Sequence, residues 1–551
     1  MRIVLAYLMP EIWLTLLGFF ILIADFMSPR GNRRWLGLVA GWGVAGAVLL
    51  TIVQMWWVSH AEPGLTGATD TLSHFLSGSV AVDNMALFLK LAILIGSTLV
   101  IFSALDYAER RIHHAPGEFW AFLVFASLSM CFMTVGIELI TLFLAIEFTS
   151  IASYLLAAWL RDDPRSSEAG MKYFLVGATT TAVTLYGMSL VYGLTGSTHL
   201  IEISEAIQAG GSSRMLLVAG VLMLASLGFK VAMVPFHGWA PDTYEGSPTP
   251  ITAFLSVASK AAGFAIILRI LIIGLGVDSA QWGMTIAFIS VASMTLGNLA
   301  AIPQRNIKRL MAYSSIAQVG YMLIAVACFN AIDLNVLTVS DGVKHLMPAG
   351  ATNDWTLLMG GREATSEDMA LPGLLFYVLA YTFSNMGAFA VIILVGNAIG
   401  SDHIDDYSGL IKRNPWATVL MTVFFLSLIG IPFFAGFWAK LMIFGGAIAR
   451  SLTEVSLPDG TIDRPYSHLA WLVVIGVVNS VISVYYYLEV VRRMWFHEPK
   501  DPSPIRGGLA LNGVLTVCFI ATVVLFGLFP GLFMNLAQQS VEGALRILGA
   551  V

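Results

Sequence analysis

The chain is dominated by fourteen apolar segments that are about as long as a membrane crossing or longer. A helix needs about 20 apolar residues to span a bilayer. Of the 551 residues, 57% are hydrophobic and 11% are charged, which is far more apolar surface than a soluble domain of this size needs for its core. The sequence therefore predicts an all-α polytopic membrane protein with about fourteen transmembrane helices. The predicted segments are Ile3–Met27, Trp35–Val58, Val82–Leu105, Phe119–Val135, Ile137–Leu160, Met171–Thr195, Met215–Phe236, Ile251–Ile273, Trp282–Ile302, Leu310–Ala331, Leu371–Gly396, Trp416–Ala449, Leu469–Trp495 and Leu509–Phe529.

Basic residues in the loops predict how these segments are oriented. If alternate loops lie on alternate sides, sixteen lysines and arginines fall on one side and seven on the other. Because basic residues concentrate on the cytoplasmic side, both termini are predicted to lie on the outer, periplasmic face. The larger group is Arg30, Arg33, Arg34, Arg110, Arg111, Arg161, Arg165, Arg305, Lys308, Arg309, Lys412, Arg413, Arg492, Arg493, Lys500 and Arg506; the smaller is Arg2, Arg214, Lys344, Arg362, Arg450, Arg464 and Arg546.

Charge and cysteine content argue against several other functions. The net charge of −5 is spread over the loops without a basic stripe, so nucleic acid is not an expected partner. Cys131, Cys328 and Cys518 lie singly in apolar segments with no CxxC pair, so the sequence offers no basis for an iron–sulfur cluster, a zinc site or a disulfide framework. We expect no cofactor on this chain. The two long outer loops, Ser59–Ala81 and Asp333–Asp368, are expected to be solvated caps that do not separate domains.

One stretch, Phe229 to Phe264, holds two lysines in apolar runs with a segment rich in Pro and Gly between them. A charge is costly inside a bilayer, and Pro interrupts helices. Lys260 lies about 16 Å into its predicted helix and is therefore close to the middle of the membrane. Buried basic groups beside broken backbone indicate an ion path. The alternative is that Lys230 and Lys260 extend to the lipid headgroups.

Glu147 lies about 15 Å into the fifth predicted segment, again close to mid-bilayer. A carboxylate at that depth needs a partner, and Lys230 is the natural one; the alternative is a permanently protonated packing group. At a separation of about 4 Å and an effective dielectric of about 20, the two charges would attract by about 4 kcal/mol. Separating them would release the lysine proton and reuniting them would restore it, which predicts a pumping step. Glu138 is predicted to be interfacial.

The twelfth segment, Trp416–Ala449, would be about 50 Å long as one helix, against a hydrocarbon core of about 30 Å. A break is therefore predicted near Ile431–Gly436, which contains Pro432. Lys440 follows just after it. The seventh segment has a similar Val234-Pro235-Phe236 after its lysine. Two such breaks, five segments apart, indicate an internal repeat whose two copies are inverted.

Three further polar residues lie in or beside the apolar segments. His237 could pass protons near neutral pH, or it could satisfy backbone groups freed by the break. Lys90, seven residues after Asp83, is either paired locally or forms a minor lateral site. Arg269 lies near the end of its helix and is predicted to extend to the headgroups.

Three long stretches resemble a known family. They are IEFTSIASYLLAAWL at 146–160, FKVAMVPFHGWAPDTYEGSPTPITAFLSVASKAAGF at 229–264 and PQRNIKRLMAYSSIAQVGYML at 303–323. They resemble the proton-translocating, antiporter-like membrane subunits of complex I, and most of all the subunit N type. The resemblance covers nearly the whole chain from the fourth to the thirteenth segment. It implies two inverted five-helix repeats, segments four to eight and nine to thirteen, with the seventh and twelfth helices discontinuous.

The same resemblance implies the units of the chain and its functional residues. The units would be residues 1–118, 119–275, 276–500 and 501–551. The family's relay residues map onto four positions that depth in the membrane also selects, and a lysine at the last of them is typical of subunit N. These positions are Glu147, Lys230, Lys260 and Lys440.

The function that the resemblance implies is that of a membrane-arm subunit of a proton-pumping NADH:quinone oxidoreductase, a translocase of the bacterial inner membrane. NADH, quinone, FMN and iron–sulfur clusters are expected on partner subunits, and the other membrane-arm subunits and the lipid bilayer are the expected partners. One alternative is a homologous membrane subunit of a multi-subunit Na+/H+ antiporter or of a membrane-bound hydrogenase. The other is a passive scaffold that anchors neighbouring subunits.

Overall fold

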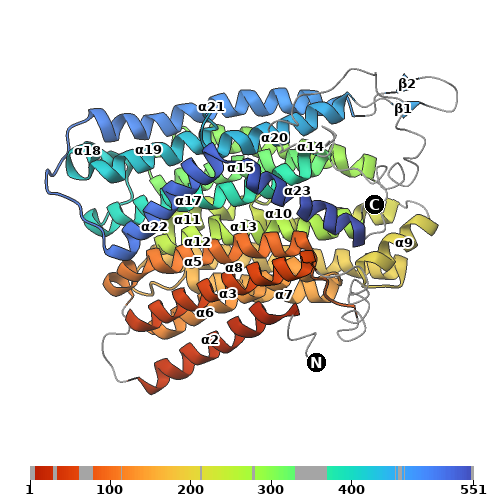
Figure 1. The fold of residues 1–551 in the computed structure, drawn as a ribbon, viewed down its shortest axis with the longest axis horizontal. Coiled ribbons are helices and arrows are strands. Elements are labelled where there is room, and N and C mark those ends of the chain that lie inside the picture. Colours follow the sequence, from red (N-terminus) through yellow and green to blue (C-terminus); the bar gives the residue numbers. More distant parts are fainter. Residues whose placement is uncertain are drawn as a thin grey trace.

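A computed structural model shows a bundle of long helices that run side by side (Figure 1). The structure describes residues 7–28, 34–60, 78–112, 114–210, 214–275, 279–328, 369–452, 455–456, 462–463 and 466–547. Thirteen helices within these ranges are long and apolar enough to cross a membrane, so the prediction of an all-helical polytopic membrane protein is confirmed. The predicted caps at Ser59–Ala81 and Asp333–Asp368 lie almost entirely outside the described residues.

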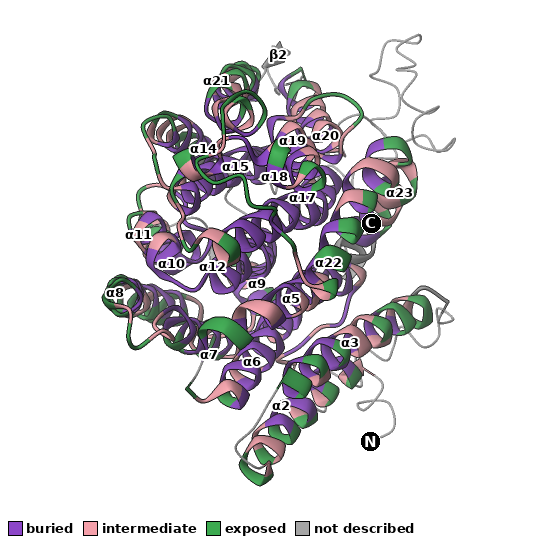
Figure 2. Cartoon of the chain, turned by 90° about the vertical axis from the view of Figure 1, so that its left-hand side faces the viewer, coloured by how far each residue is buried: buried purple, intermediate pink, exposed green. Residues whose placement is uncertain are grey.

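The first three long helices differ in how deeply they are buried. They are α2 (Met9–Met27), α3 (Arg34–His60) and α5 (Asn84–Arg111). Helices α2 and α3 form one side of the bundle and expose apolar side chains there, as expected of helices that face lipid (Figure 2). Helix α5 is mostly buried, and its first turn is capped by the Asp83 carboxylate, which accepts a hydrogen bond from the Ala86 amide at 2.8 Å.

The next group of helices contains the seventh and eighth predicted segments. Its elements are α6 (Pro116–Val135), α7 (Leu139–Ala157), α8 (Pro164–Thr195), α9 (Leu200–Gly210), α10 (Arg214–Val231), α11 (Trp239–Gly246), α12 (Thr249–Ser256), α13 (Ala258–Leu268) and the π-helix η1 (Arg269–Gly274). The short α9 was not predicted, because at eleven residues it is too short to appear as a membrane segment.

The last group contains the twelfth predicted segment and the C-terminal helices. Its elements are α14 (Ser279–Ala301), α15 (Ile307–Cys328), α17 (Ala370–Ile399), η5 (Ile404–Tyr407), α18 (Leu410–Arg413), α19 (Pro415–Ile429), α20 (Ala435–Ser451), β1 (Val455–Ser456), β2 (Ile462–Asp463), α21 (His468–Phe496), α22 (Leu509–Phe519), the π-helix η6 (Ile520–Leu528) and α23 (Gly531–Ile547). The two short strands pair antiparallel. Helix α2 begins and α23 ends at the same end of the bundle (Figure 1).

Both predicted helix breaks are present. Residues 430–434 separate α19 from α20, and Gly430 adopts a φ of 96° that only glycine reaches without strain. Neither half is long enough to count among the thirteen spans, which is why fourteen predicted segments give thirteen long helices. In the seventh segment α10 ends at Val231, and α11 begins at Trp239. A third interruption, at Val257 between α12 and α13, was not predicted, because no Pro or Gly marks it.

The centre of the bundle is formed by α15, α17 and the α12–α13–η1 segment. Almost every residue of these helices is enclosed by other helices, whereas α2, α8 and α21 each expose an apolar face (Figure 2). The central helices therefore offer a protein environment, not lipid, to any polar side chain that they carry.

Arg269 does not extend to the headgroups, so that prediction is wrong. Its side chain is buried, forms an ion pair with Asp83 Oδ2 at 2.5 Å and donates two hydrogen bonds of 3.0 Å to the Thr134 carbonyl. The position of Arg269 along its own helix could not reveal partners that α5 and α6 supply.

Lys90 does not pair with Asp83, the acidic residue seven positions before it. Asp83 is engaged with Arg269, and Lys90 instead forms an ion pair with Glu11, which lies in the first turn of α2. Both members of this pair are buried. The interpretation that Lys90 pairs locally with Asp83 is therefore wrong.

We expect Arg269→Met to destabilise the protein by about 3–5 kcal/mol, because it leaves the Asp83 carboxylate buried without a cation. The control is Arg492→Met, which removes a largely exposed arginine that pairs with Glu489 and should cost at most about 1 kcal/mol. Thermal unfolding of the detergent-solubilised protein compares the two. Equal unfolding midpoints for the two variants would show that the buried pair contributes no more than a surface pair.

Candidate functional site

Glu147 lies on α7 and is half-buried against α8. Its Oε1 accepts a hydrogen bond of 2.6 Å from Thr181 Oγ1. Among the described residues, no lysine or arginine nitrogen lies within 4.0 Å of its carboxylate oxygens. The acid is thus held by a neutral hydroxyl, which leaves its second oxygen available to another partner.

Lys230 lies in the last turn of α10 and is buried. Its Nζ lies 3.5 Å from Ser150 Oγ, and Ser150 is one turn beyond Glu147 on α7. Lys230 Nζ and the Glu147 carboxylate are farther apart than 4.0 Å. The structure therefore places the predicted pair on neighbouring helices and shows it separated, with Ser150 beside it.

Lys260 lies in the first turn of α13, immediately after the interruption at Val257. It is buried, and its Nζ donates a hydrogen bond of 2.8 Å to the Ser315 carbonyl on α15. At Gly263, one turn farther on, a Cβ atom would lie 2.5 Å from Val231 Cγ1 and 3.4 Å from Lys230 Cγ. Glycine at this position therefore lets α10 approach α13 closely and brings Lys230 beside the helix that carries Lys260. Neither lysine extends to lipid headgroups, so that alternative is excluded.

Lys440 lies on α20 and points back into the break that precedes it. Its Nζ donates to the carbonyls of Leu428 at 3.2 Å and Ile429 at 2.7 Å, and to Ser480 Oγ at 2.8 Å. Those carbonyls belong to the last turn of α19, where a helix has no further amides to offer and where its dipole favours a cation. Lys440 therefore provides hydrogen-bond donors for carbonyls that the break leaves without an amide partner, and these carbonyls in turn bind its ammonium group.

Gln318 on α15 connects the surroundings of Lys260 and Lys440. Its Nε2 donates to the Leu428 carbonyl at 3.0 Å, which is the carbonyl that Lys440 also contacts. It lies one turn beyond Ser315, and its Oε1 accepts a hydrogen bond from the Tyr377 hydroxyl. Beside it is a cavity with a volume of about 10 Å³, close to the smallest that holds one water.

His237 lies between α10 and α11 and is half-buried. Its Nδ1 atom is buried and makes no hydrogen bond to the described residues. Among the described residues, no hydrogen bond joins His237 to Lys230, Lys260 or Lys440. Within the described part of the chain, no group of three His, Cys, Asp or Glu side chains could hold a metal ion, and the three cysteines are free and buried.

Several residues of the site escaped the sequence analysis. Ser315, Gln318 and Tyr321 recur at three-residue spacing and so share one face of α15. That polar face was the available signal within 303–323. It is a weaker indication of function than a lysine in an apolar run, because an uncharged polar side chain costs less than a charge inside a membrane. Ser150 and Thr181 could not have been distinguished from other helix hydroxyls without the structure.

A family model described as NADH:quinone oxidoreductase/Mrp antiporter, TM matches residues 137–340 and 357–458 of the chain. NADH-quinone oxidoreductase subunit N of Desulforamulus reducens is 35% identical over 540 residues, covering 98% of each chain. The protein of the same name from Trichlorobacter lovleyi is 37% identical over 542 residues, covering 97% of this chain and 96% of its own.

Solved structures are similar over the same extent. A chain of respiratory complex I from Thermus thermophilus with bound aureothin matches with a TM-score of 0.70 and 28% identity, covering 96% of this chain and 99% of its own. A chain of the Mrp complex from Dietzia sp. DQ12-45-1b matches with a TM-score of 0.76 at 19% identity, covering 100% and 99%. Because the identity to the Mrp chain is only 19%, this similarity shows a shared fold and nothing more.

We expect Gly430→Ala to cost about 1–3 kcal/mol of stability, because alanine is strained at a positive φ. Its Cβ would also lie 3.0 Å from Lys440 Cδ and would press on the lysine stem. The matched control is Gly445→Ala on α20, where no atom lies within 4 Å of the added Cβ and alanine is the better helix former. Thermal unfolding should separate the two variants; if both are as stable as the parent, the break does not depend on glycine.

Proposed function

The chain belongs to the family of NADH-quinone oxidoreductase subunit N, an antiporter-like membrane subunit of complex I, and from that membership we propose that it moves protons through a relay at mid-membrane. The proposed relay residues, in order, are Glu147, Lys230, Lys260 and Lys440.

The observation that carries the proposal is the environment of the three lysines. Their exposed fractions are 3%, 3% and 5%. None of them has a described carboxylate within 4.0 Å; each is met instead by a hydroxyl or a backbone carbonyl. An ammonium in a low-dielectric interior without an anion is held weakly, because neutral dipoles offset only part of its lost hydration. Such a group can alternate between ammonium and amine, as a proton carrier must.

Each proposed transfer moves one proton and no electrons. An ammonium becomes a neutral amine when it gives its proton to a hydrogen-bonded neighbour, and the next amine in the line becomes an ammonium. Transfer between Lys260 and Lys440 would use the space beside Gln318, where a single water fits and where the Tyr377 hydroxyl already lies within the hydrogen-bond network. No redox group is needed on this chain for these steps.

Glu147 is proposed to control when Lys230 holds its proton. In the structure the acid is bonded to Thr181 and the lysine is near Ser150, which corresponds to the separated arrangement. Movement of the carboxylate toward Lys230 would favour the ammonium through the Coulomb attraction, and its return to Thr181 would favour release. His237 is proposed to exchange protons with water at the break that follows α10.

The finer features of fold and location are also part of the proposal. We propose two inverted repeats, one spanning 119–275 and one spanning 276–500, flanked by 1–118 and 501–551. In support, α10 and α19 both end at an interruption that contains a positive-φ residue, Ala232 in one case and Gly430 in the other. Both termini are proposed to face the periplasm of a bacterial inner membrane, with the other membrane-arm subunits and lipid as partners and with NADH, quinone, FMN and iron–sulfur clusters held elsewhere in the complex.

Lys230→Ala tests the relay directly. In the assembled complex reconstituted in vesicles, we expect NADH-driven proton uptake to fall by about 100-fold, the usual contribution of a positioned proton donor, while the complex still assembles. The control is Lys412→Ala, which removes an exposed lysine paired with Glu498 and should leave pumping unchanged. Undiminished proton uptake in Lys230→Ala would refute the relay and favour a passive scaffold.

Glu147→Gln tests the proposed control of Lys230. Loss of the carboxylate removes the charge that favours the ammonium, so Lys230 should give up its proton at lower pH. The alkaline limb of the pumping profile is therefore expected to move down by about one pH unit. The pumping profile of Thr181→Val serves as the comparison, because this variant removes the hydrogen bond to Glu147 but keeps the carboxylate charge. An unmoved profile in Glu147→Gln would exclude this pair as the switch.

A further inference from the structure

We propose that Tyr321 is a further functional residue of the chain: its ring holds the charged form of Lys440, and Asn298 and Tyr486 are positioning residues that fix the ring. The inference rests on the proposed function in one respect, because it assumes that Lys440 carries a proton. None of the three residues was singled out in the sequence analysis.

The contact between Lys440 and Tyr321 joins α20 to the central helix α15. Lys440 Nζ lies 4.4 Å from the centroid of the Tyr321 ring, within the range of a cation–π interaction. The ring also contacts Phe444, one turn beyond Lys440 on α20, with 6.4 Å between ring centroids. Tyr321 is fully buried, so its ring is shielded from bulk solvent. An aromatic face attracts an ammonium and not a neutral amine, so this contact favours the protonated lysine.

Asn298 on α14 holds the ring by its hydroxyl. Asn298 Nδ2 donates to the Tyr321 hydroxyl at 3.1 Å and to the Asn479 carbonyl at 3.0 Å. Asn298 Oδ1 in turn accepts a hydrogen bond of 3.1 Å from the Tyr486 hydroxyl on α21. Both Asn298 and Tyr486 are buried. The amide is therefore bonded from two helices and can rotate only if both sets of bonds break.

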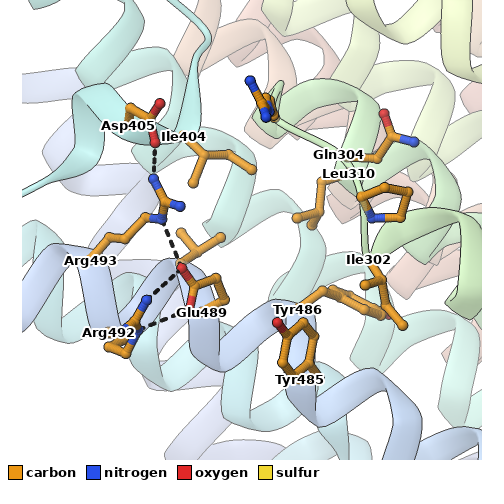
Figure 3. Close-up of a pocket in the computed structure, with 13 residues that line it drawn as sticks. Ile302, Gln304, Leu310, Ile404, Asp405, Tyr485, Tyr486, Glu489, Arg492 and Arg493 are labelled. Carbon is orange, nitrogen blue, oxygen red and sulfur yellow. Dashed lines mark hydrogen bonds and ion pairs between the residues drawn. The ribbon is translucent and has the colours of Figure 1, made fainter.

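Tyr486 is itself held at the edge of a pocket of about 260 Å³, at the end of the bundle where α18 lies (Figure 3). One turn beyond Tyr486 on α21, Glu489 accepts hydrogen bonds of 2.9 Å from both Arg492 and Arg493, and Arg493 also pairs with Asp405 of η5. Figure 3 shows this ionic chain beside Tyr485 and Tyr486. These ion pairs fasten α21 to η5 and so fix the helix that carries Tyr486.

The other groups that surround Lys440 do not offer it a competing anion. The helices packed against α20 are α15, α17, α19, α21 and η6, and the described residues of α19 and η6 include no titratable side chain. The described titratable groups near the level of Lys440 are tyrosines: Tyr321 on α15, Tyr377 and Tyr381 on α17, and Tyr486 and Tyr487 on α21. Arg450 lies ten residues farther along α20, about 15 Å away. Beside the carbonyls at the end of α19, the Tyr321 ring is therefore the described group that favours the charged form of Lys440.

The test compares the pH dependence of proton pumping by the assembled complex in vesicles. Tyr321→Leu removes the ring, so Lys440 should lose its proton at lower pH, and the alkaline limb should move down by about one pH unit. Tyr321→Phe keeps the ring but loses the hydroxyl through which Asn298 fixes it, so its limb should move much less than that of Tyr321→Leu. A purely structural role would lower pumping equally at every pH without moving the limb.

A milder pair of variants keeps the test decisive if Tyr321→Leu does not assemble. Tyr486→Phe removes only the hydroxyl that fixes Asn298 and should move the limb in the same direction by a smaller amount. Tyr485→Phe, at the exposed neighbouring position, should not move it. The proposal is overturned if Tyr486→Phe and Tyr485→Phe have the same profile, or if Tyr321→Phe shifts as far as Tyr321→Leu.

Lys440→Met separates this inference from the proposed function. If Lys440→Met leaves pumping intact, Lys440 carries no proton and the proposed relay fails at this position. If Lys440→Met abolishes pumping while Tyr321→Leu retains the parent profile, the relay stands and only the role of Tyr321 fails.

Discussion

The structure depends on one constraint: a cation inside a membrane protein must be bonded by groups that the fold itself leaves free. An unbroken helix uses nearly all its carbonyls, so it has little to offer an ammonium. The end of α19 at Ile429 frees two carbonyls, and Lys440 bonds to both. The aromatic ring of Tyr321 covers the same ammonium from another side. The break between α19 and α20 thus provides the binding site for the Lys440 ammonium.

Five buried cations in the described part of the chain differ in the kind of partner that they have. Arg269 and Lys90 are each matched by a buried carboxylate, Asp83 and Glu11, which links the first helices to the rest of the bundle. Among the described residues, the lysines at 230, 260 and 440 have only neutral partners. A fully matched pair resists a change of protonation, whereas an ammonium held by dipoles can yield its proton at lower cost. The difference separates a structural role from the proposed transport role.

The sequence revealed those features that depend on one helix at a time. The length of Trp416–Ala449 required a break, which is confirmed. Lys260, predicted from an apolar run, lies buried in a segment long and apolar enough to cross a membrane. Features that depend on two helices were missed or wrong. Arg269 was predicted to reach the headgroups from its position near the end of its helix, since the sequence does not show that Asp83, far away in the chain, lies beside it. Gln318 was overlooked because only the structure shows that it shares the Leu428 carbonyl with Lys440. The interruption at Val257 was missed because no Pro or Gly marks it in the sequence.

The central claim is that a continuous polar line connects Glu147 with Lys440 through the middle of the bundle. The most direct measurement is a density map of the assembled complex at a resolution that shows ordered water. The account predicts water between Ser150 and Lys260 and in the cavity beside Gln318, so that hydrogen bonds run without a gap from the acid to the last lysine. A map in which apolar side chains fill either interval and no water is present would contradict it.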